Sequence, residues 1–189
     1  ALAVEAIASV VDALLAGAPD RTLSVGVDSE WGSKGGSDAP PSVVQMAVIG
    51  HAWVVDAQAV GPELGRLLAR IVGDCRVRVL GFAFARDATR LAALMPQQDR
   101  VVWSPESLVH AITDLQRVAM AREPFASKPG DVLGLRRVAE FFLGRTMDKS
   151  LQCSDWDGRP LTNSQLSYAA ADAAVLLDIA MAMGVGEET

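Results

Sequence analysis

Apolar positions along this 189-residue chain follow two different spacings. Short apolar runs flanked by turn residues predict strands at 23–27, 43–49, 52–55, 78–82 and 101–103. Apolar residues three and four positions apart predict helices at 2–15, 63–72, 87–94, 105–119, 132–143 and from Thr162 to about Met183. The second and third strands form a hairpin, and later strands alternate with helices. This order predicts an α/β fold with a mixed sheet.

The last predicted helix has the clearest boundaries. Thr162 is the expected N-cap, and Gln165 three residues later completes a capping box. Gly184 marks the expected end. Ahead of the hairpin, residues 32–41 are rich in glycine, serine and proline, which predicts a flexible loop.

Composition excludes several classes of protein. Half of the residues are hydrophobic and 21% are charged, which excludes a disordered chain, a collagen-like chain and a disulfide scaffold. The apolar runs fall short of the ~20 residues of a membrane-spanning helix, so we expect no membrane association. The two cysteines, Cys75 and Cys153, lie far apart and predict free thiols in a reducing compartment, cytoplasmic or nuclear. The net charge of −6 argues against nonspecific phosphate binding, but not against an enzyme that reaches phosphates through metal ions.

Acidic residues stand where α/β folds bind ligands. Asp28 and Glu30 share one face at the end of the first strand, although a solvated strand end is equally consistent with them. Asp87 begins a helix after the strand 78–82, where the helix dipole alone would favour an acid. Tyr168 and Asp172 share one face of the last helix, among alanines that make an unpaired acid costly.

Four converging carboxylates suit two hard divalent cations such as Mg²⁺. Such a pair, about 3.5–4 Å apart, clamps the attacking and leaving oxygens of an in-line phosphoryl displacement. A tyrosine hydroxyl beside the ions is suited to orienting the attacking water.

The order Asp-x-Glu, then Asp, then Tyr-x3-Asp resembles the DEDDy class of 3′–5′ exonucleases, which have the DnaQ-like, ribonuclease H-like fold. The segment MDKSLQCSDW at 147–156, with RPLT at 159–162, is similar to the Mut-7/Nibbler and Werner-type branch, related to ribonuclease D. The resemblance implies a mixed β-sheet flanked by α-helices. It implies an exonuclease domain at 21–184, a helix at 1–20 packed on this domain, and a tail at 185–189.

The resemblance also implies roles for the acidic residues. Asp28 would contact two ions, Mg²⁺ or Mn²⁺, and Glu30 and Asp172 would help to hold one of them. Asp87 would help to position the other, partly through water, and Tyr168 would orient the nucleophilic water. The sequence departs from the pattern at Arg86, where relatives usually carry a small residue. Arg86 is expected to contact a phosphate, to pair with a site carboxylate, or to crowd the metal.

Further residues are candidates for binding a frayed 3′ end, which needs aromatic stacking and local positive charge. Trp31 directly follows the acidic pair and would flank the terminal nucleotide, unless it is a core-edge residue. Trp156 lies in the loop before the last helix. Lys149 and Arg159 flank this loop and could meet phosphates, or be solvated surface charges. Strand parity does not decide whether Gln45 faces the site.

These features predict an exonuclease that releases nucleoside 5′-monophosphates from the 3′ end of single-stranded nucleic acid. The Mut-7/Nibbler resemblance favours RNA, of the small-RNA trimming type, with further domains or small-RNA effector proteins as candidate partners. The alternatives are the same reaction on DNA and a scaffold module that binds nucleic acid with weak catalysis. A Rossmann-type nucleotide-binding domain is disfavoured, because the chain has neither a GxGxxG motif nor a P-loop.

Overall fold

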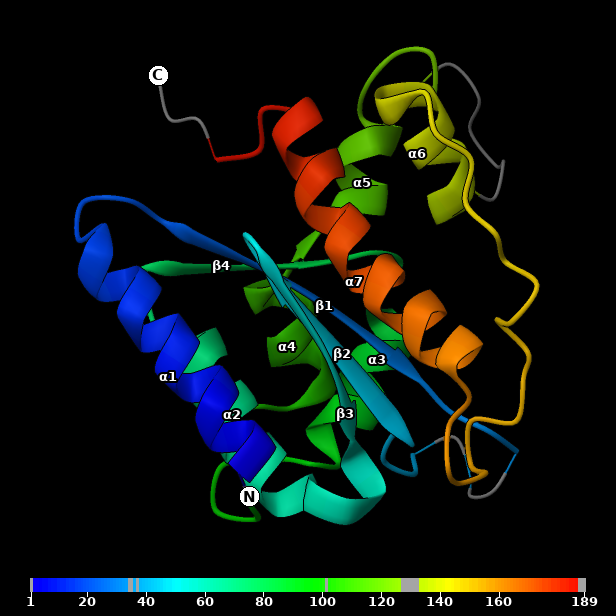
Figure 1. Cartoon of the computed structure of the whole chain (residues 1–189). Helices are drawn as coiled ribbons and strands as arrows, with labels where there is room; N and C mark the ends of the chain where they lie inside the picture. The colour runs from blue at the N-terminus through cyan, green and yellow to red at the C-terminus, as the bar shows by residue number, and fades with distance from the viewer. Residues whose placement is uncertain (1, 34–35, 37, 101, 127–132, 187–189) are drawn as a thin grey trace.

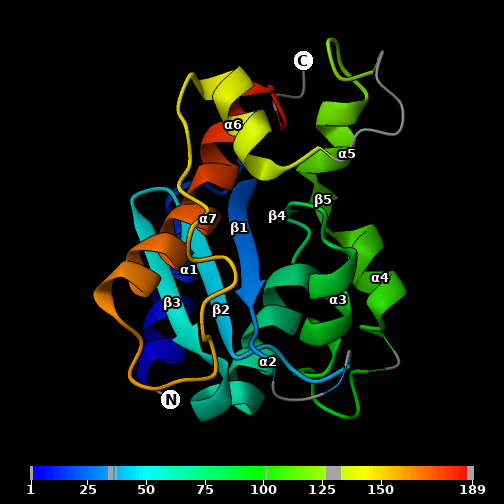
Figure 2. The same cartoon turned by 90° about the vertical axis from the view of Figure 1, so that its right-hand side faces the viewer.

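The computed structural model describes residues 2–33, 36, 38–100, 102–126 and 133–186. Five strands form one sheet in the order β3-β2-β1-β4-β5 (Figure 1 and Figure 2). They are β1 (Leu23–Glu30), β2 (Val43–Val48), β3 (His51–Asp56), β4 (Val77–Gly81) and β5 (Thr113–Asp114). β1 pairs antiparallel with β2 and parallel with β4, so the predicted mixed sheet is confirmed.

Helices cover both faces of the sheet (Figure 2). They are α1 (Leu2–Gly17), α2 (Ala57–Gly73), α3 (Ala85–Ala92), α4 (Pro105–Ala111), α5 (Leu115–Met120), α6 (Leu135–Leu143) and α7 (Asn163–Ala182). α1, α2, α3 and α4 share one hydrophobic core with the sheet, and α5, α6 and α7 form a second core with Leu80 of β4. The central strand β1 therefore separates two packed layers.

The two faces of β1 pack against different helices. Val25 and Val27 are buried in the core that contains α1 and α2. Gly26 faces the other way, against α7, where an added Cβ would lie 2.4 Å from the carbonyl oxygen of Ala173. A side chain at Gly26 would therefore push α7 away from the sheet. Asp28 follows on the α7 face, by the alternation of the strand.

The sequence-based boundaries need correction in the middle of the chain. Val102 and Trp103 form a turn instead of the predicted strand, and residue 101 lies outside the described part. The amide groups of both residues donate to the carbonyl oxygen of Asp99, at 3.0 and 2.8 Å. These bonds close a turn, so the apolar run does not join the sheet.

The predicted helix 105–119 is two helices separated by β5. Ile112 has extended backbone angles at the end of α4, and Asp114 pairs with Gly81 of β4. The Asp114 side chain then caps α5 by accepting a hydrogen bond from the amide of Gln116. α2 begins at Ala57, six residues before the predicted start, with a kink at Val60.

α7 is the long helix next to the acidic end of β1. Its predicted capping box is confirmed, because Thr162 and Gln165 each accept a hydrogen bond from the other's backbone amide. Within the described residues, α7 alone is long and apolar enough to cross a membrane. This corrects the expectation that the chain contains no such segment. Nearly half of that apolar window is buried, and α7 packs on β1, β2 and β3, as a core helix does.

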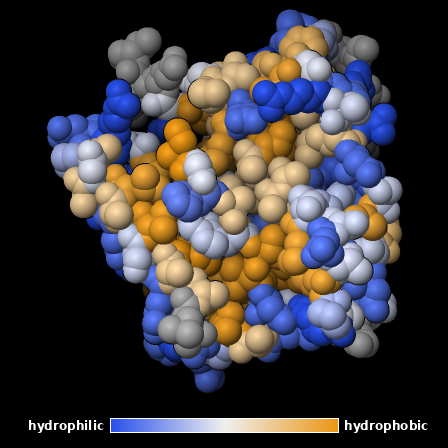
Figure 3. Space-filling view, in the orientation of Figure 1, coloured by the Kyte–Doolittle hydropathy of each residue, from blue (hydrophilic) through white to orange (hydrophobic). Residues whose placement is uncertain are grey.

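The edge strand β3 is less covered than the centre of the sheet. It pairs with β2 alone, and His51 and Ala52 at its start are exposed. Figure 3 shows apolar side chains gathered across the middle of this view, which Figure 1 identifies as the side of α1, β3 and α7. The acidic residues lie at another place, at the carboxyl end of β1.

Candidate active site

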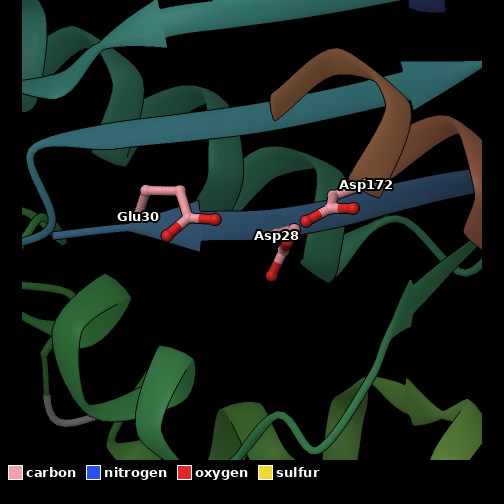
Figure 4. A group of neighbouring side chains, drawn as sticks. All are labelled: Asp28, Glu30 and Asp172. Atoms are coloured by element: carbon pink, nitrogen blue, oxygen red, sulfur yellow. The ribbon is translucent and has the colours of Figure 1, made fainter. Parts of the chain in front are cut away.

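Three carboxylates meet where β1 ends under α7 (Figure 4). Asp28, Glu30 and Asp172 each offer an oxygen, and these oxygens lie within 4.8 Å of one another. Strand alternation places Asp28 and Glu30 on the α7 face, and the close approach at Gly26 brings Asp172 above them. The structure thus brings together three of the four acids predicted from the sequence.

Asp87 lies at the start of α3 and lines the same cleft, outside the group of three. It is buried, and the Ser29 hydroxyl donates to its Oδ1 at 2.6 Å. Ser29 stands between the two acids of β1 and, by strand alternation, points to the opposite face. One short strand segment therefore presents two carboxylates and anchors a further one. Sequence reasoning did not single out Ser29, because a serine between two acids carries no signal of its own.

Burial and mutual repulsion raise the pKa values of the acids. Burial raises the pKa of Glu30 to about 9, with Asp28 and Asp172 adding to the effect. Burial also raises the pKa of Asp87 to about 6, against the hydrogen bond from Ser29. The pKa of Asp28 is raised by burial, then by the charges of Asp87 and Asp172. Acids that protonate so readily lack sufficient positive charge around them, and hard divalent cations with oxygen ligands fit this set.

Lys149 supplies one positive charge to the site. Its Nζ donates to Oδ1 and Oδ2 of Asp172, at 2.9 and 2.8 Å. Burial still raises the pKa of Asp172, while Lys149 opposes that shift. The sequence suggested Lys149 as a phosphate contact or a solvated charge; the structure places it on a predicted metal ligand.

Tyr168 lies one helical turn before Asp172, and its side chain is buried. Its ring packs on Trp156, with the ring centroids 5.9 Å apart. Burial, followed by the charges of Asp172 and Glu30, raises the pKa of the phenol well above its usual value. Tyr168 therefore keeps its proton at neutral pH and can both donate and accept a hydrogen bond.

A cleft of about 970 Å³ opens over the acids. Arg86 lines one wall from α3, and Arg136 lines it from α6. Arg86 is exposed and makes no ion pair among the residues that the structure describes, so the expected pairing with a site carboxylate is wrong. Arg136 was missed from the sequence, because a surface arginine on a helix distant in the chain gives no local signal. It also bonds Glu140 on its own helix, at 3.1 Å.

Trp31 lines the cleft directly after the acids of β1 and is half-buried. The guanidinium carbon of Arg90 lies 4.4 Å from the centroid of its ring. Arg90 also donates to the carbonyl oxygen of Ala39, at 3.1 Å. One arginine thus supports the ring and fixes the end of the loop that follows it.

Two predicted substrate contacts are wrong, because the side chains of Trp156 and Gln45 are buried, while a third candidate, Arg159, is held by an ion pair. Trp156 is fully buried, and its Nε1 donates to the carbonyl oxygen of Gln152 at 3.3 Å. Gln45 is fully buried opposite Asp28 in the β1–β2 register. Arg159 donates to both carboxylate oxygens of Asp56, at 2.7 and 2.8 Å, and to three backbone carbonyl oxygens. Its guanidinium joins the loop to the sheet, and its contact with a phosphate stays a prediction.

Comparison with known proteins agrees with this geometry. A family described as 3′–5′ exonuclease matches residues 5–185. The chain belongs to the 3′–5′ exonuclease family. It is 33% identical over 175 residues to the human exonuclease mut-7 homolog, a match that covers 84% of this chain and 20% of that protein. It is also 33% identical over 142 residues to ribonuclease D of Nitrobacter hamburgensis, covering 75% of this chain and 33% of that protein.

Solved structures show the same fold. The Nibbler EXO domain of Aedes aegypti is 25% identical, with a TM-score of 0.61, over 90% of this chain and 81% of that one. RNase D of Escherichia coli is 24% identical, with a TM-score of 0.67, over 96% of this chain and 43% of that one. The predicted ribonuclease H-like fold and the resemblance to the Mut-7/Nibbler branch are confirmed. The chain spans only 18% to 25% of the length of the first three mut-7 relatives.

Proposed function

We propose that this chain is a metal-dependent 3′–5′ exonuclease acting on single-stranded nucleic acid, with RNA as its substrate. The observation that carries the proposal is the group formed by Asp28, Glu30 and Asp172 in a member of an exonuclease family. The presence of Asp87 and Tyr168 beside this group argues against a scaffold that has lost catalysis.

The donor set determines where divalent cations would bind. Asp28, Glu30 and Asp172 would hold one ion, Mg²⁺ or Mn²⁺, and Asp28 with Asp87 would hold a second. When bound, such ions activate a water molecule and stabilise the charge of the phosphate in the transition state. This chemistry would release nucleoside 5′-monophosphates.

The protein's own groups would orient the reactants. The neutral hydroxyl of Tyr168, beside Asp172, would hold the attacking water through a hydrogen bond. Arg86 and Arg136 on the cleft walls would attract the phosphate backbone. Trp31, supported by Arg90, would stack on the terminal base.

The preference for RNA is supported by the relatives. Ribonuclease D proteins are among those at least 30% identical to this chain. RNase D of Trypanosoma brucei, 22% identical and of the same fold, was solved in complex with RNA U12. We further propose an exonuclease domain at 21–184 with α1 packed on it, and additional domains or small-RNA effector proteins as partners. The exposed free thiols of Cys75 and Cys153 support a cytoplasmic or nuclear location.

A gel assay with 5′-labelled single-stranded RNA and matched DNA tests the proposal. We expect a ladder that shortens from the 3′ end of the RNA with Mg²⁺ or Mn²⁺ and is absent with EDTA. Asp28→Asn and Asp172→Asn should each lower the rate at least about a thousandfold, since each removes a ligand of the ions. Asp178→Asn is the matched control on α7, because Asp178 contacts Arg145 at the surface, 3.4 Å away. No cleavage of either the RNA or the DNA would contradict the proposal. Preferential cleavage of the DNA would contradict the choice of RNA as the substrate.

A further inference from the structure

Lys149 occupies the oxygens that a cation at this site would use. Its ammonium contacts both oxygens of Asp172, at 2.9 and 2.8 Å. The Asp172 side chain is only 3% exposed, and that of Lys149 is 22% exposed. The carboxylate thus has little surface left for another partner while Lys149 stays in place.

Lys149 also lies next to Tyr168, which does not line the cleft. Its Nζ lies 5.3 Å from the centroid of the Tyr168 ring. Lys149 lines the cleft, Tyr168 lines a second hollow, and Asp172 lines both. The Tyr168 hydroxyl is buried and has no hydrogen-bond partner of good geometry among the described residues. A tyrosine that orients water must be reachable from the cleft, so the contact of Lys149 with Asp172 describes a closed site.

The surroundings allow Lys149 to leave without refolding the protein. It lies in the stretch 145–149, which forms no helix or strand, and the amide of Ser150 is held by the Asp148 carboxylate at 2.8 Å. The backbone of this turn can therefore stay fixed while the flexible four-carbon stem of the lysine moves. The cleft into which the ammonium would move is the one proposed to receive phosphates.

We propose that Lys149 is an exchangeable counter-ion of the acidic group. In the metal-free protein it holds Asp172 and separates Tyr168 from the cleft. When a divalent cation binds, Lys149 leaves Asp172, opens the path to Tyr168 and pairs with a phosphate of the substrate. The inference rests on the proposed function, because it requires the carboxylates to bind a divalent cation.

If Lys149 and the divalent cation compete for Asp172, removal of Lys149 should have opposite effects on cation binding and on catalysis. Removing the ammonium should raise the affinity for the cation and lower catalysis, whereas damage to the site would lower both. We expect Lys149→Met to bind Mn²⁺ about tenfold more tightly, within the range of ordinary coupling between two ligands. Its kcat should fall, because the phosphate loses a positive partner.

Titration calorimetry of Mn²⁺ into the EDTA-treated, desalted protein measures the first effect. Arg145→Met is the matched control, since it removes the same charge from the same stretch but touches Asp178 at the surface instead of Asp172. Its affinity for Mn²⁺ should equal that of the wild type. A melting temperature within a few degrees of the wild type would show that Lys149→Met is folded.

A second measurement follows Lys149 itself. Labelling of its amine by an acylating reagent, read by mass spectrometry, should become faster when Mg²⁺ is added, because the ion pair opens. If the affinity rises in Lys149→Met but this labelling rate stays constant, Lys149 does not leave Asp172 and the exchange is wrong. An unchanged affinity for Mn²⁺ also overturns it. If the wild-type protein binds no Mn²⁺ at all, the proposed function fails as well.

Discussion

The side chains on the two sides of the cleft are positioned by different kinds of structure: a strand and a helix on one side, and a loop on the other. On the sheet side, Asp28 and Glu30 are placed by the alternation of one strand, and Asp172 by a helix that packs closely on it. On the other side, residues 145–162 contain no helix or strand. Lys149 and Arg159 lie ten positions apart there, yet one contacts a site carboxylate and the other fastens the loop to Asp56. In the loop, a basic residue is functional or structural according to the acceptors within its reach.

The largest expected effect on stability comes from the carboxylates of the sheet side in the metal-free protein. Glu30 ordinarily titrates near 4.5, and its pKa in the folded protein is raised to about 9. Between these values the folded state holds a proton that the unfolded state releases, so the free energy of unfolding falls as pH rises. We expect a loss of at least about 2 kcal/mol from pH 5 to pH 9, measured by urea unfolding in EDTA.

Two controls test the origin of that decline. Glu30→Gln removes one of the titrating groups and should make the decline shallower, because Asp28, Asp87 and Asp172 still titrate. Mg²⁺ should stabilise the wild type most at high pH. A stability that rises with pH across this range would show that the acids are not short of positive charge. The loop side should not contribute, because the Asp56 carboxyl beside Arg159 has its pKa lowered instead.

Tyr168 belongs to both sides, since its ring packs on Trp156 of the loop and its hydroxyl lies beside Asp172. Tyr168→Phe keeps the ring packing and removes only the hydroxyl. We expect kcat on single-stranded RNA to fall about a hundredfold, the lower end for a group that positions a proton in transit. The affinity for Mn²⁺ and the melting temperature should stay close to the wild type. A large loss of stability would instead assign the hydroxyl a structural role.

On the loop side, loss of Arg159 should lower the stability of the protein and leave substrate binding unchanged, which is the reverse of the Tyr168→Phe pattern. Arg159→Met removes the hydrogen bonds to Asp56 and to the carbonyl oxygens of Ser42, Trp156 and Gly158. Since the Arg159 side chain is 27% exposed, we expect a loss of about 1–2 kcal/mol in the free energy of unfolding. The KM for RNA should change little. A raised KM with unchanged stability would instead support the prediction that Arg159 binds a phosphate.

The same contrast explains how much the sequence could predict. A period of two placed Asp28 with Glu30, and a spacing of four placed Tyr168 with Asp172, because both follow from local geometry. That Asp172 meets the two acids of β1 was implied by the family resemblance and not by these spacings. Trp156 could not be placed, since the motif does not say which way a loop side chain turns. β5 was missed for a related reason: Asp114 is extended by pairing with Gly81, 33 positions earlier, while its neighbours follow a helical pattern.

The smallest expected effect concerns the rim of the cleft, formed by Trp31 and Arg90. Arg90 contacts both the Trp31 ring after β1 and the loop at Ala39. Arg90→Met removes the cation from the Trp31 ring and the hydrogen bond to Ala39. We expect the KM for RNA to rise about fivefold with kcat nearly constant, the value of one exposed cation–π contact. Arg66→Met on the surface of α2 is the control, since Arg66 pairs only loosely with Glu63, at 3.6 Å.

A double-mutant cycle decides whether Arg90 acts through Trp31. Trp31→Leu removes the stacking surface and should raise the KM at least as much as Arg90→Met. If the arginine only supports the ring, Arg90→Met should add nothing once the ring is gone, and the two effects on KM should be strongly non-additive. Full additivity would mean that Arg90 binds the substrate independently. In that case Arg90 would resemble the basic residues of the loop side, whose roles depend on the acceptor that each one can reach.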